Sequence, residues 1–120
     1  MSQFLHQDLA DGKWFTMTLF EQMSNIGSEV HRTILAGEDE EQRKGAFRRA
    51  LELFYLTLSD PRWKGTGRYK EIGRVYELYC HAVLGNNEFK TSLEDLDRYF
   101  HPYTYAAQLE RHQMRKNKTH

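Results

Sequence analysis

Apolar residues recur every three or four positions along most of the chain, which is the spacing of one face of an α-helix. The first such segment begins at Thr18, where Thr18 and Glu21 form a capping box that satisfies amides of a first helical turn. It stops at Gly37, a residue suited to a helix C-terminus. We therefore predict a helix over 18–37. Its inner stripe consists of Leu19, Met23, Ile26, Val30 and Ile34.

Gly27 lies beside this stripe, although glycine costs about 1 kcal/mol of helix propensity relative to alanine. A close approach of another helix at this position would explain the glycine. Asn25, Ser28 and Glu29 fall on the polar side of the same helix. We expect these three residues to tie the helix to a loop or to a partner.

The second periodic segment predicts a helix over 40–59, followed by Pro61. Leu53 and Leu56 point away from its inner stripe by roughly 100° or more, at 100° of rotation per residue. A helix that is apolar nearly all round is buried on more than one side. We expect either a central helix or a subunit interface, with Leu53 and Leu56 as the interaction surface. The inner stripe consists of Phe47, Ala50, Leu51, Phe54 and Leu58.

Two further segments complete the pattern. The third predicts a helix over 68–84 that stops at Gly85, and the fourth opens with two overlapping capping boxes at Thr91 and Ser92. The apolar rhythm of the fourth passes through Pro102, which removes a hydrogen bond inside a helix. We expect one kinked helix or two helices that abut at Pro102. The two inner faces are Tyr69, Ile72, Tyr76, Cys80 and Val83, and then Leu93, Leu96, Phe100, Tyr103, Ala107 and Met114.

Four helices with short connections predict an all-α fold, an up-down antiparallel four-helix bundle, in a single domain spanning residues 1–120. A chain of this length buries a core without disulfides or metals. We expect residues 1–17 to form an N-terminal segment, the first thirteen residues of which make one or two loose helical turns. Residues 111–120 contain four basic residues and no acidic residue, and we expect a disordered tail there.

The formal net charge of zero hides an uneven distribution. Residues 1–60 contain 10 acidic and 6 basic residues, whereas residues 61–120 contain 7 acidic and 11 basic residues. A partner that binds the second half by charge would therefore be anionic. Cys80 is the only cysteine and lies on an apolar face, which favours a packed thiol and a cytoplasmic location. The longest apolar run, residues 53–56, is too short to span a membrane, so we expect no membrane partner.

Carboxylate–histidine pairs raise the question of a metal site. No glutamate has a histidine three residues later, which is the spacing used by di-metal helical bundles. The pairs Glu77–His81 and Asp97–His101 have a spacing of four, and local ion pairs explain them better. We expect no metal and no cofactor.

The connection between the second and third helices combines basic and aromatic residues. Arg62, Trp63, Lys64 and Arg68 precede a helix N-terminus, where exposed amides attract anions and a ring can stack on a base. These four residues are the candidates for contact with an anion or a nucleic acid. The alternative is that Trp63 covers the open end of the core and the basic residues keep the loop in water.

Arg74 and His81 are close to two helical turns apart, so they share one face of the third helix. This spacing resembles the Arg-x(4–6)-His motif of HEPN-domain proteins, which are small helical bundles and in many cases dimeric, metal-independent ribonucleases. The resemblance implies a guanidinium that neutralises the scissile phosphate and an imidazole that transfers protons. The helical wheel supports the alternative of a solvated charged stripe, because Arg74 and His81 lie opposite the apolar face.

The stretches NIGSEVHRTI (25–34) and ALELFYLTLSDPRWKG (50–65) resemble a small bacterial family of helical proteins. This resemblance, which extends from Trp14 to Tyr103, implies a bundle from a prokaryotic cytosol and provides no catalytic residues to transfer. We therefore expect a non-enzymatic module for protein interaction or self-association, a homo-oligomer and most simply a dimer. The alternative is a toxin-type HEPN-like ribonuclease that uses Arg74 and His81.

Overall fold

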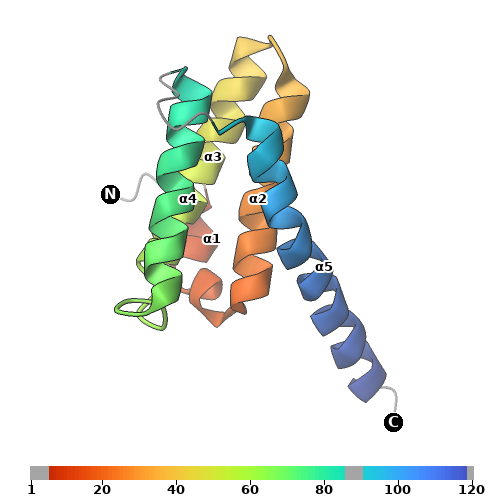
Figure 1. The fold of residues 1–120 in the computed structure, drawn as a ribbon. Helices are drawn as coiled ribbons and strands as arrows, with labels where there is room; N and C mark the ends of the chain where they lie inside the picture. The colour runs from red at the N-terminus through yellow and green to blue at the C-terminus, as the bar shows by residue number, and fades with distance from the viewer. Residues whose placement is uncertain (1–5, 86–90, 119–120) are drawn as a thin grey trace.

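The computed structural model describes residues 6–85 and 91–118, and its regular structure in these ranges is entirely helical (Figure 1). Two short N-terminal turns precede four long helices that alternate in direction, as the predicted up-down bundle requires. The elements are α1 (Gln7–Ala10), η1 (Lys13–Thr16), α2 (Leu19–Ala36), α3 (Glu40–Leu58), α4 (Gly67–Leu84) and α5 (Leu93–Lys118).

The predicted end signals of α2 and α5 are confirmed. The Thr18 hydroxyl accepts the amide hydrogen of Glu21 at 3.2 Å, and Gly37, with φ of 54°, ends α2. At the start of α5, the Ser92 hydroxyl accepts the amide hydrogen of Asp95 at 3.0 Å, and the Asp95 carboxylate accepts that of Ser92 at 3.2 Å. In both helices a side-chain oxygen therefore accepts a hydrogen bond from a first-turn amide that has no carbonyl partner within the helix.

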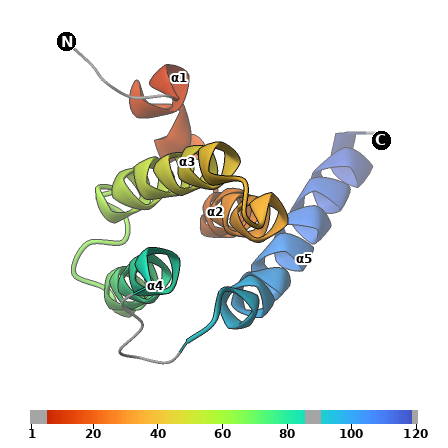
Figure 2. The same ribbon diagram turned by 90° about the horizontal axis from the view of Figure 1, so that it is seen from above.

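Helix α2 lies between α3 and α5 and packs against both, while α4 lies across the bundle from α2 and contacts α3 and α5 (Figure 2). Helix α5 approaches α2 closely at Gly27, where a Cβ atom would lie 2.7 Å from the Cβ of Phe100. No larger residue fits there without a shift of one helix. The predicted close approach at Gly27 is thus confirmed.

The core lies between the four long helices. Its predicted members that are fully buried are Met23, Ile26, Val30, Phe54, Ile72, Leu96 and Phe100. The inner face of α4 is rotated from the prediction, because Val75 and Tyr79 are buried whereas Tyr69 is exposed. The Tyr79 hydroxyl lies 2.8 Å from the Thr33 hydroxyl of α2, and this contact turns the Tyr79 side of α4 inward. The other predicted core residues that are only partly buried include Leu19, Phe47, Leu51, Leu58, Tyr76, Val83 and Tyr103.

The prediction of Leu53 and Leu56 as an interaction surface is wrong, because each is only 3% exposed. The N-terminal segment covers that side of α3 (Figure 2). Trp14 of η1 is fully buried and donates its indole hydrogen to the Thr57 hydroxyl at 3.0 Å. The sequence predicted loose turns for the first thirteen residues and did not place Trp14 on α3, so it left this face of α3 without a cover.

Helix α5 is continuous through Pro102, so the alternative of two abutting helices is wrong. Pro102 and Arg98 are both exposed, and water can therefore satisfy the Arg98 carbonyl that loses its donor. The Thr18 hydroxyl donates to the Glu110 carboxylate at 2.9 Å, close to the start of α2. Beyond Glu110 the helix continues past the bundle to Lys118, across the segment where we expected a disordered tail (Figure 1).

Candidate functional site

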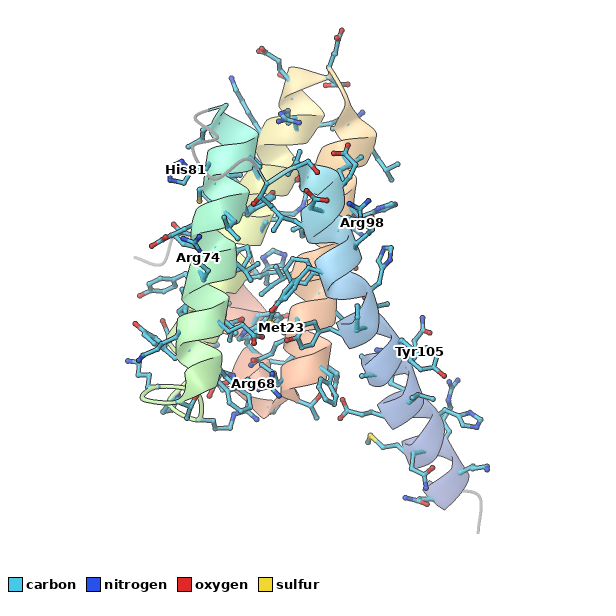
Figure 3. The ribbon with its side chains drawn as sticks, viewed as in Figure 1. Met23, Arg68, Arg74, His81, Arg98 and Tyr105 are labelled. Atoms are coloured by element: carbon cyan, nitrogen blue, oxygen red, sulfur yellow. The ribbon has the colours of Figure 1, made fainter. Side chains whose placement is uncertain are left out.

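Arg74 and His81 project from the side of α4 that faces away from α2 (Figure 3). Arg74 is exposed, and its guanidinium lies 3.8 Å from the carboxylate of Glu77, one turn further along the helix. This arrangement agrees with the alternative of a solvated charged stripe. A ribonuclease centre would have to be assembled from two copies, so that hypothesis stays a prediction.

The connection between α3 and α4 is organised around a buried carboxylate. Asp60 is fully buried and receives hydrogen bonds from Arg62, from Nε to Oδ1 at 3.0 Å and from Nη2 to Oδ2 at 2.7 Å. The same Nη2 donates to the Met17 carbonyl at 2.7 Å. Burial alone would raise the pKa of Asp60, but the hydrogen bonds from Arg62 and Gln22 outweigh it and lower that pKa.

Gln22 joins this carboxylate to both tryptophans. Its amide nitrogen donates to Asp60 Oδ2 at 3.0 Å and to the Trp14 carbonyl at 2.9 Å, while its oxygen accepts the indole hydrogen of Trp63 at 2.8 Å. We call Trp14, Gln22, Asp60, Arg62 and Trp63 the base network. Both polar atoms of the Gln22 side chain form hydrogen bonds within the chain. The network therefore has a structural role and acts as a clamp that joins η1, α2 and the α3–α4 connection.

The base network agrees with the structural interpretation of the basic, aromatic connection. Arg62 is committed to Asp60, and Trp63 packs on the end of the core, as the alternative prediction stated. Lys64 and Arg68 are exposed, and Arg68 lies 3.8 Å from Glu71. Arg62 and Trp63 therefore belong to the base network, Lys64 and Arg68 face solvent, and contact of these four residues with an anion or a nucleic acid stays a prediction.

Sequence reasoning missed Gln22 and Asp60. The available signal was the position of Gln22, which lies three residues after Leu19 and four before Ile26 and hence within the apolar stripe. A polar residue on a buried face needs a hydrogen-bond partner. The identity of that partner depends on the fold, because Asp60 is far away in the sequence.

Glu29 ties α2 to α3. It is only 3% exposed, accepts a hydrogen bond from Arg49 Nε at 2.8 Å and also contacts Arg32 on its own helix. The expected tie of this polar side was to a loop or to a partner, whereas Glu29 ties α2 to another helix of the same chain, and the Asn25 amide also lies 3.9 Å from the Met17 sulfur in the connection before α2. Asn25 and Ser28 instead donate to carbonyls within α2, those of Glu21 and Ser24.

A polar contact also joins α4 to α5. The hydroxyls of Tyr99 and Tyr103 both donate to Oε1 of Glu71, at 2.8 and 2.6 Å. The bond from Tyr103 and then that from Tyr99 lower the pKa of Glu71, against the effect of burial. Burial, together with this carboxylate, raises the pKa of both tyrosines. The cluster holds the two helices together with the carboxylate charged.

A groove of about 370 Å³ lies between α2 and α5 beside Gly27. Within it Asp97 lies between two imidazoles, 3.3 Å from His31 Nδ1 and 3.4 Å from His101 Nε2. The predicted pair Asp97–His101 is therefore present, and His31 adds a link to α2. Among the described residues, no group of three or more histidine, cysteine or acidic side chains has the geometry to hold a metal ion.

Cys80 is partly buried on α4. Burial raises the pKa of its thiol, so the reactive thiolate is scarce at neutral pH. This agrees with the prediction of a packed thiol.

The end of α5 is the remaining candidate. Tyr105, Leu109 and Met114 are 64%, 51% and 56% exposed, and residues 111–117 are exposed throughout. Arg111 and Arg115 flank Met114. Tyr105 and Leu109 lie on the side of α5 opposite Met114, at about 180° and 140° around the helix. We call Arg111, Met114 and Arg115 the C-terminal surface. It combines apolar area with positive charge on a helix that has left its own bundle (Figure 3).

None of the helices in the described part of the chain is both long and apolar enough to cross a membrane. The two family resemblances stay predictions, and the chain's own geometry is the basis for assigning a function. No protein-family model, no curated protein and no solved structure matches this chain.

Proposed function

We propose that this chain is a protein-association module whose binding element is the C-terminal surface. The observation that carries the proposal is Met114. Phe100, Ala107 and Met114 recur at intervals of seven, close to two helical turns, and thus lie along one row of α5. Phe100 and Ala107 are buried against the bundle, whereas Met114 lies beyond the start of α2 and is 56% exposed. The apolar row of α5 therefore extends beyond the helix α2 against which its earlier members pack.

Exposed apolar area of this kind supports a binding role, because more than half of the Met114 side chain meets water on a row of α5 whose earlier members Phe100 and Ala107 are buried. The arginines beside Met114 add the residue type that is enriched at protein interfaces. The predicted binding role of helix α3 thus moves to α5. The proposal places the module in the cytosol of a bacterial cell, in line with its single cysteine and with the resemblance of residues 25–34 and 50–65.

Site-specific photo-crosslinking tests the proposal. A photo-reactive amino acid is placed at position 114 of the full chain, and in a control chain at position 69, where Tyr69 is also exposed. We expect position 114 to form covalent adducts with protein in expressing cells, at least about tenfold more than position 69. Mass spectrometry identifies the peptide in each adduct. Equal labelling at both positions, or none at position 114, would contradict the proposal.

A further inference from the structure

The contact of α5 with α2 ends before α5 itself ends (Figure 1). The two helices run in opposite directions, because Gly27 lies against Phe100 whereas Thr18, the residue that caps α2, donates to Glu110 at 2.9 Å. Helix α5 then continues over residues 111–118, about two further turns. In the part of the chain that the structure describes, residues 111–117 are exposed throughout, so no helix of the bundle covers this stretch.

The positive charge of this stretch distinguishes it from the bundle. Arginines of the bundle lie beside carboxylates, as Arg49 does at 2.8 Å from Glu29 and Arg62 at 2.7 Å from Asp60. Residues 111–118 contain no acidic residue, and within the described ranges Arg111 and Arg115 form no ion pair. Their guanidinium groups are therefore available to the carboxylates of another molecule.

The order of the charges around α5 limits what can bind. Arg111 and Met114 are about 60° apart around the helix, and Arg115 lies about 40° further on the same flank. Glu110 lies about 40° from Met114 on the other flank. An exposed apolar side chain thus has positive charge on one side and a carboxylate on the other.

This arrangement favours a protein helix over a nucleic acid. A phosphate backbone has no apolar side chain to cover Met114, and the Glu110 carboxylate would repel it. The seven-residue interval of Phe100, Ala107 and Met114 is the repeat with which helices pack on one another. In such packing the residues that flank the apolar row select the partner by charge. A helix with an apolar row and acidic residues on one flank therefore matches both features.

We infer that the partner of the C-terminal surface is an acidic amphipathic helix of another protein, which lies in line with α2 and packs on Met114. The inference rests on the proposed function and names the class of partner for the same site. The apolar row of the partner helix covers Met114. Acidic side chains on one flank of that helix pair with Arg111 and Arg115.

The contact is short and hence reversible. Residues 111–118 extend roughly 12 Å at 1.5 Å of rise per residue. A segment of this length buries well under the roughly 1,200–2,000 Å² of a stable interface. The charge pairs are open to solvent at its edge, so binding weakens as salt is added.

Fluorescence anisotropy with labelled probes and the purified full chain tests the inference. The first probe is a synthetic helical peptide of about three heptads, with leucine in its apolar row and glutamate on both flanks. The second probe has lysine in place of each glutamate, and the third is a DNA duplex of about 20 base pairs. We expect the glutamate peptide to bind at least about tenfold more tightly than the lysine peptide at low salt. The difference should shrink at about 0.5 M salt.

Three variants assign the binding to this surface. Arg111→Gln with Arg115→Gln removes two charges but keeps good helix formers, and should reduce the affinity for the glutamate peptide by at least about tenfold. Met114→Gln leaves the charge unchanged and should reduce that affinity by at least about threefold, because the apolar contact is lost. The matched control, Lys64→Gln with Lys70→Gln, removes two exposed charges elsewhere and should change it by less than about twofold. Circular dichroism checks that each variant keeps its helix content.

Four results would overturn the inference. These are equal affinity for the two peptides, unchanged affinity in the double arginine variant, unchanged affinity in Met114→Gln, and tighter binding of the DNA duplex than of the glutamate peptide. The crosslinking experiment separates this failure from failure of the proposed function. Adducts at position 114 whose peptides are not acidic, or come from a second copy of this chain, would retain the function and exclude the acidic helix of another protein.

Discussion

Helix α5 meets its two neighbours in different ways. Against α2 it packs so closely that Gly27 has no room for a side chain beside Phe100. Against α4 it uses hydrogen bonds from Tyr99 and Tyr103 to Glu71, whose side chain is still 40% exposed. The contact of α5 with α2, which we call the α2–α5 seam, is determined by how closely the side chains fit. The contact with α4, the α4–α5 seam, is determined by hydrogen bonds to a charged carboxylate. Changes of shape should therefore dominate at the α2–α5 seam, and pH should matter at the α4–α5 seam.

The largest effect is expected from Phe100, the ring that fills the α2–α5 seam and is 1% exposed. Phe100→Ala removes a buried ring and should lower the free energy of unfolding by about 3–5 kcal/mol. Urea denaturation followed by circular dichroism measures the change. A loss below about 1 kcal/mol would show that the seam closes over the cavity, and that volume does not specify it.

The next effect compares two helical glycines. Gly27→Ala places a Cβ against Phe100 and should cost about 1–2 kcal/mol, since overpacking outweighs the gain in helix propensity. Gly73→Ala on α4 meets no atom within 4 Å and should instead stabilise the protein by up to about 1 kcal/mol. Thermal melts of both variants show whether each substitution lowers or raises the melting temperature. The same sign in both would refute the close packing at Gly27.

At the polar seam, Tyr103→Phe should cost about 0.5–1.5 kcal/mol at pH 7 because one hydrogen bond to Glu71 is lost. The folded state lowers the pKa of Glu71, so this stabilisation is present above the ordinary carboxyl pKa. It is lost as the pH falls through the lowered value and Glu71 becomes protonated. Urea titrations at pH 7 and pH 3 should show the difference between wild type and Tyr103→Phe shrinking at low pH. A difference independent of pH would assign the tyrosine to packing alone.

The smallest effect belongs to the outer side of α4. Arg74→Ala and His81→Ala should each change the free energy of unfolding by well under 1 kcal/mol, as is usual for surface positions outside the core. We also expect the purified protein not to cleave RNA. A ribonuclease assay beside both variants decides this. Cleavage that disappears in both variants, with unchanged melting curves, would make this pair an active site.

The local features of the fold were predictable because neighbouring residues determine them. Thr18 and Ser92 cap their helices through residues three positions away, and Gly27 is a costly residue whose presence demands a reason. The helix pattern also follows from spacing alone. The continuation of α5 beyond Glu110 was predictable in part, because Gln, Met, Arg and Lys favour helix, but charge suggested a disordered tail instead.

The remaining features depend on contacts between distant segments. Leu53 and Leu56 were assigned to a subunit interface because nothing local shows that Trp14 covers α3. The orientation of α4 depends on the pairing of Tyr79 with Thr33. The candidate site at Met114 was assigned to the core stripe, since a sequence gives the period of a helix and does not say where its neighbour begins.

The base network also determines how unfolding can be observed. Trp14 and Trp63 are the two tryptophans of the chain, and both are hydrogen-bonded to Gln22 of this network at one end of the bundle. Intrinsic fluorescence therefore reports on that end, whereas circular dichroism reports on all helices. Separation between the two transitions would show that some helical structure is lost independently of the end that holds the tryptophans.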